Sequence, residues 1–387
     1  MMNSADNAQA TAEGAGSATK PCVAVVFGGR SSEHSVSLIT ARSVLRAINR
    51  DRWDVVSVGI STDGAWFLYS QDELEALLDH QPLATLPVGD QRVTLPLQVG
   101  ENELLVHDLN SEGGTITRGR HIDAVFPLLH GPFGEDGTLQ GLLELADLPY
   151  VGCGVSASAI GMDKHFMKVA FEAAGLEVGP YTVVHNRDWL TNSEQVRENV
   201  AALGFPVFVK PARAGSSFGI TRVDRAEDLD VAIETAREHD LKLVIEAGIE
   251  GREIECAVLG GHEWSAPRAS LPGEIEVQGH DFYDFEAKYV EDDGARLSCP
   301  ANLPGDVIET LREKAVQAFD AIDGEGLSRC DFFVTPDHRV VINEINTMPG
   351  FTPISMYPRM WAASGLEYPD LIDELISLAL ERPVGLR

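Results

Sequence analysis

A strand–turn–strand segment near the end of the chain constrains the fold most. Residues 329–334 have the sequence RCDFFV and residues 340–346 have the sequence VVINEIN, both rich in the apolar, aromatic and β-branched residues of strands. Between them, residues 336–338 (PDH) are types that favour turns. Residues 347–352 (TMPGFT) continue as a loop rather than as further strand. The segment predicts an antiparallel β-hairpin.

One face of this hairpin would carry four polar side chains. Because side chains alternate between faces, Arg329 and Asp331 share a face, and so do Glu344 and Asn346. A hairpin centred on residues 337–338 places Asp331 opposite Glu344 and Arg329 opposite Asn346. Unpaired charges on a half-buried hairpin are unfavourable, so a partner should neutralise them. Carboxylate and amide oxygens favour Mg²⁺. The plainer interpretation is a solvated face with an Arg–Asp ion pair; we favour the metal site, because a loop follows directly.

The composition narrows the classes of ligand. A chain of 387 residues suggests two or three subdomains, and 44% hydrophobic with 23% charged residues is typical of a globular protein. The net charge of −30, from 30 basic and 60 acidic residues, disfavours nucleic acid and anionic membranes as partners. A polyanion such as ATP would need local cations. The scarce lysines are therefore informative, in particular Lys164, Lys168, Lys210 and Lys288.

The cysteines and the lengths of the apolar segments both favour a cytoplasmic location, which is the one we expect. Five cysteines without CxxC spacing lie mostly in apolar runs, which predicts buried free thiols. No apolar run approaches about 18 residues, so we expect no membrane span. The first 20 residues are rich in Ala, Ser, Asn and Gly and lack the apolar core of a secretory signal, so we expect a disordered tail.

The N-terminal part of the chain alternates strands and helices. Apolar runs predict strands at 23–27, 54–60 and 123–129, and helical patterns reach Ile48 and span Thr138 to Leu148. Residues 63–120 show only hairpin-like pieces. This alternation predicts an open α/β layer with ligand-binding loops at the carboxyl ends of its strands.

The sequence of the middle of the chain predicts a helix, followed by two strands whose connecting loop could cover a ligand. Apolar spacing predicts one long helix from about Ser156 to Ala174. Strands at 205–211 and 220–223 enclose a glycine–serine loop, whose backbone N–H groups could cover phosphates. A plain hairpin with a flexible tip explains this loop about equally well.

Six motifs spread along the chain form a recognisable set. They are GGRSSEH at 28–34, HG at 130–131 with GEDGTLQG at 134–141, MDK at 162–164, VKP at 209–211 with GSS at 215–217, FYDFEAKY at 282–289 and NEINTMPG at 343–350. Together they resemble the D-alanine–D-alanine ligases of the ATP-grasp superfamily, over nearly the whole chain from Val23 onward. The resemblance implies an α/β, ATP-grasp fold with an N-terminal Rossmann-like domain and two ATP-grasp subdomains.

The resemblance also implies boundaries along the chain. A disordered tail at 1–20 would precede a substrate-binding α/β domain at 21–152. A central ATP-grasp subdomain would follow at 153–245. The C-terminal ATP-grasp subdomain at 246–387 would carry a mobile lid at about 279–293.

For the nucleotide, the resemblance implies two Mg²⁺ (or Mn²⁺) ions that bridge the ATP phosphates and are held by Asp331, Glu344 and Asn346. The residues that contact ATP would be Lys164, Lys210 and Lys288 at the phosphates, Glu246 at the adenine, Glu253 at the ribose, and Phe333. Phosphoryl transfer depends mostly on positioning and charge neutralisation, which suits such a set.

For the amino acids, the resemblance implies a second set of residues. Glu33 would bind the ammonium of the first D-alanine and form a hydrogen-bonded triad with Ser216 and Tyr289. His130 would lie near the first substrate, Ser355 would hold the carboxylate of the second, and Arg329 with the Gly350 N–H would stabilise the oxyanion. From the sequence alone, Glu33 is also explained as an acid stabilised by a helix N-terminus.

The expected reaction joins two D-alanine molecules through an acyl phosphate formed with ATP, and we expect a homodimer. Two alternatives within the superfamily stay open: a D-alanine–D-lactate ligase, which Tyr289 disfavours by resemblance, and another carboxylate–amine ligase. A dinucleotide-binding protein is suggested by the glycine pair at 28–29 but disfavoured, because the loop lacks the GxGxxG pattern.

Overall fold

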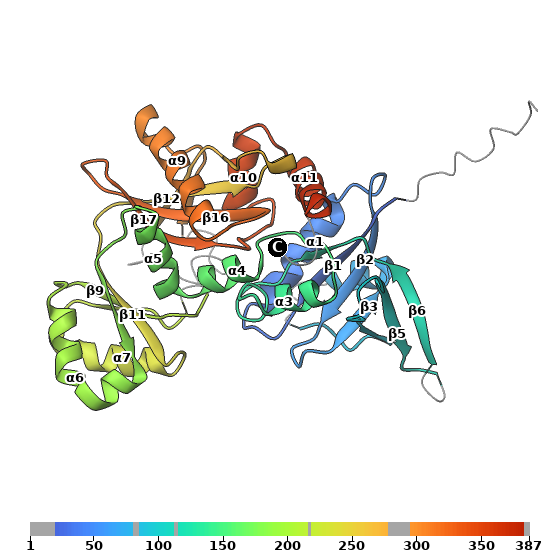
Figure 1. Ribbon diagram of the computed structural model, residues 1–387, viewed down its shortest axis with the longest axis horizontal. Coiled ribbons are helices and arrows are strands. Elements are labelled where there is room, and N and C mark those ends of the chain that lie inside the picture. The colour runs from blue at the N-terminus through green and yellow to red at the C-terminus, as the bar shows by residue number, and fades with distance from the viewer. Residues whose placement is uncertain (1–19, 80–84, 112–114, 216–217, 278–294, 383–387) are drawn as a thin grey trace, which may run out of the picture.

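The computed structural model describes residues 20–79, 85–111, 115–215, 218–277 and 295–382. Its strands form three sheets, each in its own lobe in Figure 1, one blue to cyan, one green to yellow and one orange to red. Helices pack against all three sheets, which confirms the expected α/β class. The five cysteines are free, and four of them are buried, as expected.

The first sheet contains seven strands in the order β6-β5-β4-β3-β2-β1-β7. They are β1 (Cys22–Gly28), β2 (Asp54–Ile60), β3 (Trp66–Tyr69), β4 (Gln91–Thr94), β5 (Glu103–Asp108), β6 (Thr115–His121) and β7 (Ala124–Pro127). β1 pairs in parallel with β2 and β7, and all its residues are buried, as its continuous apolar run predicted. The described part of residues 63–120 is more regular than expected: it contains four strands that extend the sheet with antiparallel pairs.

The turn after β1 depends on glycine. Gly28 has φ +91°, and a Cβ at this position would lie 2.2 Å from the carbonyl oxygen of Ile60. The turn leads to Glu33 and then to α1 (His34–Ala47). The other helices of this lobe are α2 (Gln71–Asp79) and α3 (Thr138–Leu145).

The expected single helix over residues 156–174 is wrong. The chain forms two helices, α4 (Val155–Met162) and α5 (Lys164–Ala173), separated by Asp163 in an extended conformation. The Asp163 carboxylate accepts hydrogen bonds from the N–H groups of His165 and Phe166 at 3.1 and 3.3 Å and thereby caps α5. The apolar spacing continues through the break, so periodicity alone did not reveal it.

Asp163 also forms a buried ion pair with Lys242, whose Nζ lies 2.7 and 2.9 Å from the two carboxylate oxygens. We expect Asp163→Ala to lower the free energy of unfolding by about 3–5 kcal/mol, because the Lys242 ammonium stays buried without this carboxylate and the cap is lost. Urea unfolding followed by circular dichroism measures the change. The control is Asp188→Ala, at a more exposed acid in the first turn of α6 (Asn186–Ala201). It should cost less than about 1 kcal/mol; equal losses would contradict the prediction.

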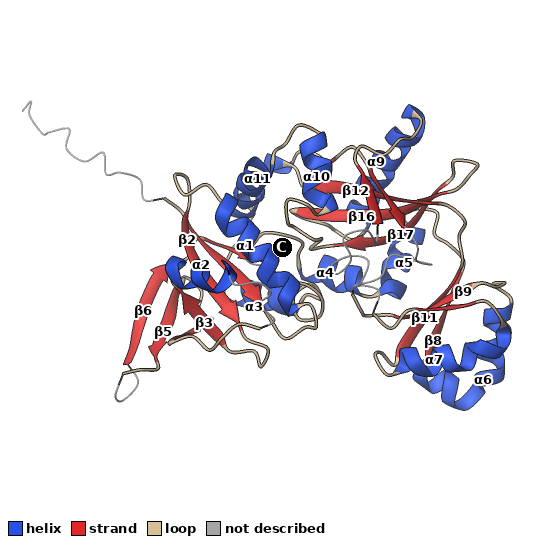
Figure 2. Cartoon of the chain, turned by 180° about the vertical axis from the view of Figure 1, so that it is seen from behind, coloured by secondary structure: helices blue, strands red, loops and turns tan. Residues whose placement is uncertain are grey.

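The second sheet is antiparallel, with the order β10-β9-β11-β8. Its strands are β8 (Tyr181–His185), β9 (Val207–Pro211), β10 (Thr221–Val223) and β11 (Lys242–Ala247). α6 and α7 (Leu229–Arg237) cover one face, where they bury Val207, Val209, Leu243 and Ile245 (Figure 2). By alternation, Lys210 and Glu246 point to the opposite face.

The third sheet has the order β15-β14-β12-β16-β17, with β13 beside β12. Its strands are β12 (Arg252–Leu259), β13 (Arg268–Ala269), β14 (Gly273–Val277), β15 (Ala295–Ser298), β16 (Leu327–Val334) and β17 (Val340–Asn346). α9 (Gly305–Ala321) packs on one face against Ile254, Cys256, Cys330 and Phe332. The charged residues that alternate with these side chains therefore share the other face.

The chain then returns to the first lobe. α10 (Met356–Ala363) and α11 (Tyr368–Glu381) follow the third sheet, and α11 lies beside α1 in Figures 1 and 2. Trp53 Nε1 donates a hydrogen bond to Asp373 of α11 at 2.6 Å. One buried cluster contains side chains of β1, α1, α10 and α11, so the first and third lobes share a core. Within the described residues, helices lack the length and apolar character needed to cross a membrane.

Candidate active site

β16 and β17 form the predicted hairpin. The expected pairs, Arg329 with Asn346 and Asp331 with Glu344, are confirmed. Nearer the turn the register is shifted by one residue, and Asn343 is the extra residue of a β-bulge. If the register at the turn continued unchanged, Asp331 would lie opposite Asn343, and Glu344 would turn to the other face. The bulge therefore brings the two acids together.

The hairpin face carries a compact network of charges. The Arg329 guanidinium donates to both oxygens of Asp331, each at 2.7 Å, and Asn346 Nδ2 donates to Asp331 at 3.0 Å. Glu255 on β12 lies 3.2 Å from Arg329 Nε. Burial disfavours the charge, yet Asp331 and Glu255 raise the pKa of Arg329 well above its usual value. The Arg–Asp ion pair of the plainer interpretation is present, but on a part-buried face that also carries Glu344.

A cluster of lysines lies across from this face. The carboxylate of Glu246 on β11 is 2.7 Å from Lys210 Nζ and 3.2 Å from Lys168 Nζ. Lys164 Nζ donates to a backbone carbonyl of the glycine–serine loop at 2.8 Å. Burial lowers the pKa of Lys164, and Lys210 and Lys168 add to this, whereas the charge of Glu344 opposes it. Of these three lysines, Lys164 and Lys210 are only partly buried, and their ammonium groups suit an anion.

Glu246 makes the stability of this cluster depend on pH. Burial alone would raise the pKa of Glu246, but the charges of Lys168 and Lys210 lower it from 4.5 to about 2. Because the folded-state pKa is depressed, the stabilisation is fully present above pH 4.5 and is lost as the pH falls from 4.5 towards 2. Its size is on the order of 3 kcal/mol.

We therefore expect Glu246→Gln to be less stable than the wild type above pH 4.5, and the difference to shrink between pH 4.5 and 2. Urea unfolding across this range measures it. Glu309→Gln, which changes a carboxylate that is 62% exposed on α9, is the control and should give a small difference at every pH. A difference for Glu246→Gln that is constant across the range would contradict the expectation.

Glu33 lies at the N-cap of α1, but its side chain makes no capping hydrogen bond. Its carboxylate instead packs against two glycines: a Cβ at Gly131 would lie 2.3 Å from Glu33 Oε2, and a Cβ at Gly215 would lie 3.0 Å from it. Gly131 also has φ +73°, so both its backbone conformation and the close approach of Glu33 require glycine there. Because Gly215 directly precedes Ser216, the structure brings Glu33 to the loop that carries this predicted partner.

His130 is buried next to Glu33. Its Nε2 lies 3.0 Å from Thr40 Oγ1, and its Nδ1 lies 3.6 Å from Glu135 Oε1. Burial opposes protonation, but Glu135 and Glu33 raise the pKa of His130, and a backbone hydrogen bond to Met348 adds to this. Burial also raises the pKa of Glu135. His130 thus connects the first lobe with the loop after β17.

The remaining predicted residues are less closely grouped. Gly350 and Ser355 lie in the loop between β17 and α10, where Ser355 Oγ accepts a hydrogen bond from the Thr352 N–H at 3.1 Å. Glu253 and Phe333 are cross-strand neighbours on the face of the third sheet that carries the acids. Three predicted residues and the expected lid at 279–293 lie outside the described residues: Ser216, Lys288 and Tyr289.

Sequence reasoning assigned no role to three charged groups of the site, of which Lys168 and Glu255 are buried. Lys168 follows Lys164 by four residues and so shares its helix face. Glu255 follows Glu253 by two residues and so shares its strand face. Glu135 belongs to the GEDG motif beside His130. In each case the position in the sequence indicated that the residue belongs to the site, but it did not reveal which charged group the side chain would pair with.

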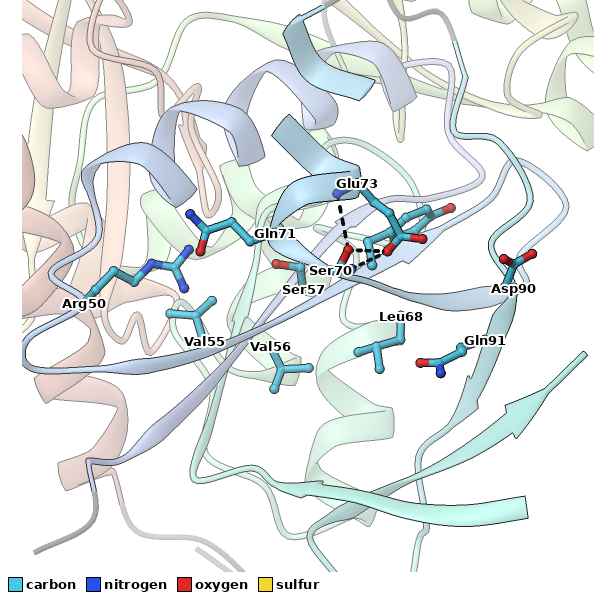
Figure 3. Close-up of a pocket in the computed structure, with 11 residues that line it drawn as sticks. Arg50, Val55, Val56, Ser57, Leu68, Ser70, Gln71, Glu73, Asp90 and Gln91 are labelled. Carbon is cyan, nitrogen blue, oxygen red and sulfur yellow. Dashed lines mark hydrogen bonds between the residues drawn. The ribbon is translucent and has the colours of Figure 1, made fainter. Parts of the chain in front are cut away.

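A hollow of about 410 Å³ lies elsewhere, on the first lobe. Figure 3 shows it beside β2 and β3, lined by Arg50, Ser57, Glu73, Asp90 and Gln91 among others. Glu73 accepts hydrogen bonds from the N–H and the hydroxyl of Ser70, so its charge is satisfied locally. In the described part of the chain, the residues lining this hollow include none of the predicted site residues. The candidate site is identified by its charges rather than by a cavity.

Comparison with protein families gives a consistent result for both parts of the chain. Residues 22–153 match the model described as D-ala D-ala ligase N-terminus, and residues 170–377 match the model described as D-ala D-ala ligase C-terminus. The chain belongs to the D-alanine–D-alanine ligase family. As a member of this family it is an ATP-dependent ligase, and the expected ATP-grasp fold is confirmed.

Individual members of the D-alanine–D-alanine ligase family are similar over almost the whole length. The D-alanine–D-alanine ligase of Kocuria rhizophila is 78% identical over 387 residues, covering 100% of both chains. That of Pseudarthrobacter chlorophenolicus is 62% identical, covering 95% of this chain and 96% of its own. The structure of the Coxiella burnetii D-alanine–D-alanine ligase has a TM-score of 0.78 at 35% identity, covering 94% of each chain. The VanG D-Ala:D-Ser ligase of Enterococcus faecalis has a TM-score of 0.79 at 35% identity, covering 93% of this chain and 100% of its own.

Proposed function

We propose that this chain joins two D-alanine molecules into D-alanyl-D-alanine, with ATP as co-substrate, in the synthesis of peptidoglycan precursors. The observation that carries the proposal is the pair of opposed groups of charges: the lysines of α5 and the second sheet, and the carboxylates of the hairpin face. The phosphates of ATP require cations, and metal cations bound to them require carboxylates. The relative that is 78% identical carries the name of this activity.

The chemistry requires that a carboxylate acquire a leaving group. A carboxylate oxygen of the first D-alanine attacks the γ-phosphorus of ATP, which forms D-alanyl phosphate and releases ADP. The amine of the second D-alanine then attacks the acyl carbon, and phosphate leaves. Lys164, Lys210 and Lys288 contact the transferred and neighbouring phosphates, while Glu246, Glu253 and Phe333 hold the adenosine.

The residues of the hairpin face fit Mg²⁺ or Mn²⁺. Asp331 and Glu344 are cross-strand neighbours, and Asn346 lies next to Asp331, so two carboxylates and one amide are close together. When bound, two such ions would neutralise the phosphate charge.

The amino acids would lie between the first and third lobes. Glu33 binds the ammonium of the first D-alanine, close to His130, and the triad of Glu33, Ser216 and Tyr289 closes the lid over it. Ser355 holds the carboxylate of the second D-alanine. Arg329 and the N–H of Gly350 stabilise the negative charge of the tetrahedral intermediate, a role in which each donor contributes about 3–4 kcal/mol.

We place the divisions at about residues 152 and 245: the first lies between β7 and β8, and the second falls within β11, the last strand of the second sheet along the chain. We also propose that ATP binds between the second and third sheets. A homodimer and a cytoplasmic location complete the proposal, and sedimentation velocity and cell fractionation test them.

Measuring ADP release with different amino acids tests the proposed substrate. D-alanine alone should support ADP release, and mass spectrometry should find D-alanyl-D-alanine. L-alanine should not replace it, and D-lactate or D-serine added with D-alanine should give minor products. D-serine is included because one similar structure is named a D-Ala:D-Ser ligase. A mixed product that exceeds D-alanyl-D-alanine would overturn the proposed second substrate.

A further inference from the structure

The lysine cluster contains one lysine that is almost inaccessible to solvent. The side chain of Lys168 is 2% exposed, whereas that of Lys210 is 13% exposed. Lys168 Nζ lies 3.2 Å from Glu246 Oε1 and 3.5 Å from the carbonyl oxygen of Asn343, the outer limit of a hydrogen bond. The same ammonium lies 5.7 Å from the centre of the Tyr181 ring. It therefore connects α5, the second sheet and the third sheet inside the protein.

Lys168 makes polar contacts with Asn343 and Glu246, and both residues matter for the geometry of the site. Asn343 is the extra residue of the bulge that sets Glu344 opposite Asp331. Glu246 is 8% exposed, and each of its oxygens lies near one ammonium, Oε1 near Lys168 and Oε2 near Lys210. A carboxylate buried to this degree is strongly destabilising without a counter-charge.

We propose that Lys168 is a positioning residue that keeps Glu246 neutralised, so that Lys210 can leave Glu246 and bind the phosphates of ATP. The inference rests on the proposed function, in which Lys210 contacts phosphate. Lys168 is enclosed by α5, β11 and β17 and cannot reach a ligand, whereas the end of Lys210 is accessible. Without Lys168, Lys210 would be the one lysine still within ion-pair distance of Glu246 among the described residues, and phosphate would have to compete with a buried carboxylate.

Lys168→Met tests this, because methionine fills a similar volume without the charge. Isothermal titration of ATP with Mg²⁺, in the absence of amino acids, should show about tenfold weaker binding, the effect of one lost charge-assisted hydrogen bond. Adenosine, which has no phosphate, should lose less than about threefold. Lys314→Met on α9 is the control and should bind both as the wild type does. Equal losses for ATP and adenosine, or unchanged ATP binding, would overturn the inference.

A second pair of variants keeps the test valid if Lys168→Met does not fold. In a Glu246→Gln background the neutral amide needs no counter-charge, so adding Lys168→Met should change ATP affinity by less than about twofold. A further tenfold loss in that background would overturn the inference, because Lys168 would then act without Glu246. If the wild type binds ATP but does not ligate D-alanine, the proposed function fails instead, and the binding results still decide the role of Lys168.

Discussion

Glu344→Gln should reduce the rate constant for ADP release by about 10³-fold or more, the largest effect we expect from a single isosteric change. Bound cations contribute several kcal/mol of charge stabilisation in phosphoryl transfer, and each decade in rate corresponds to about 1.4 kcal/mol. Asp331 already shares its oxygens with Arg329 and Asn346, so it cannot supply the missing charge. Asn346→Ala should cost only about tenfold, because an amide offers one neutral oxygen.

Two measurements check this expectation. ADP release as a function of Mg²⁺ concentration should show a higher Mg²⁺ requirement for both variants, and titration of each free enzyme with Mn²⁺ should show weaker binding. Glu309→Gln, an exposed carboxylate on α9, should keep the wild-type rate within about twofold. Near-normal turnover by Glu344→Gln would show that the hairpin face does not hold the metal ions.

Arg329→Lys should reduce turnover by about 10²–10³-fold, the effect typical of losing one oxyanion donor, while the protein stays folded. The guanidinium binds both oxygens of Asp331 and also approaches Glu255. The lysine ammonium keeps the positive charge but lacks the planar, forked N–H groups of a guanidinium. It therefore cannot bind both oxygens of Asp331 and donate to a reacting oxygen at the same time. Arg329→Met should be less stable by about 3–5 kcal/mol, because it leaves two acids without their cation.

Steady-state kinetics and thermal unfolding separate the two effects of Arg329. Arg339→Lys is the matched control: Arg339 lies at the turn of the same hairpin, is 58% exposed and pairs with Glu177. It should change neither rate nor stability appreciably. If Arg329→Lys loses as much stability as Arg329→Met, the guanidinium is a structural group and the proposed oxyanion role is wrong.

Several features of the site followed from local sequence patterns. The apolar run at 205–211 predicted a strand that ends at Lys210-Pro211, and the structure has β9 there, with Val209 packed under the helices. The hairpin pairs of Asp331 and Glu344 were predicted from alternation along the two strands. Strand alternation depends only on covalent geometry and on which face is buried, so a single sequence is enough to reveal it.

Other features were not predictable from a single sequence. The break between α4 and α5 was missed because Asp163 caps the second helix without interrupting the apolar spacing. Residues 63–120 gave only hairpin-like pieces, since short strands with exposed faces have weak alternation, as β6 shows. Antiparallel pairing at a sheet edge is decided by the neighbouring strand rather than by the strand itself.

The sequence by itself determined which residues share a strand face, and its motifs resemble those that hold a nucleotide and its cations in a known family, because both are local properties of the chain. Only the tertiary structure decided how those residues are paired. The bulge at Asn343 turns Glu344 towards Asp331, and the packing of α5 between two sheets places Lys168 on Glu246. The physical reason is that a buried charge must find its counter-charge, and packing between distant segments determines which one it meets.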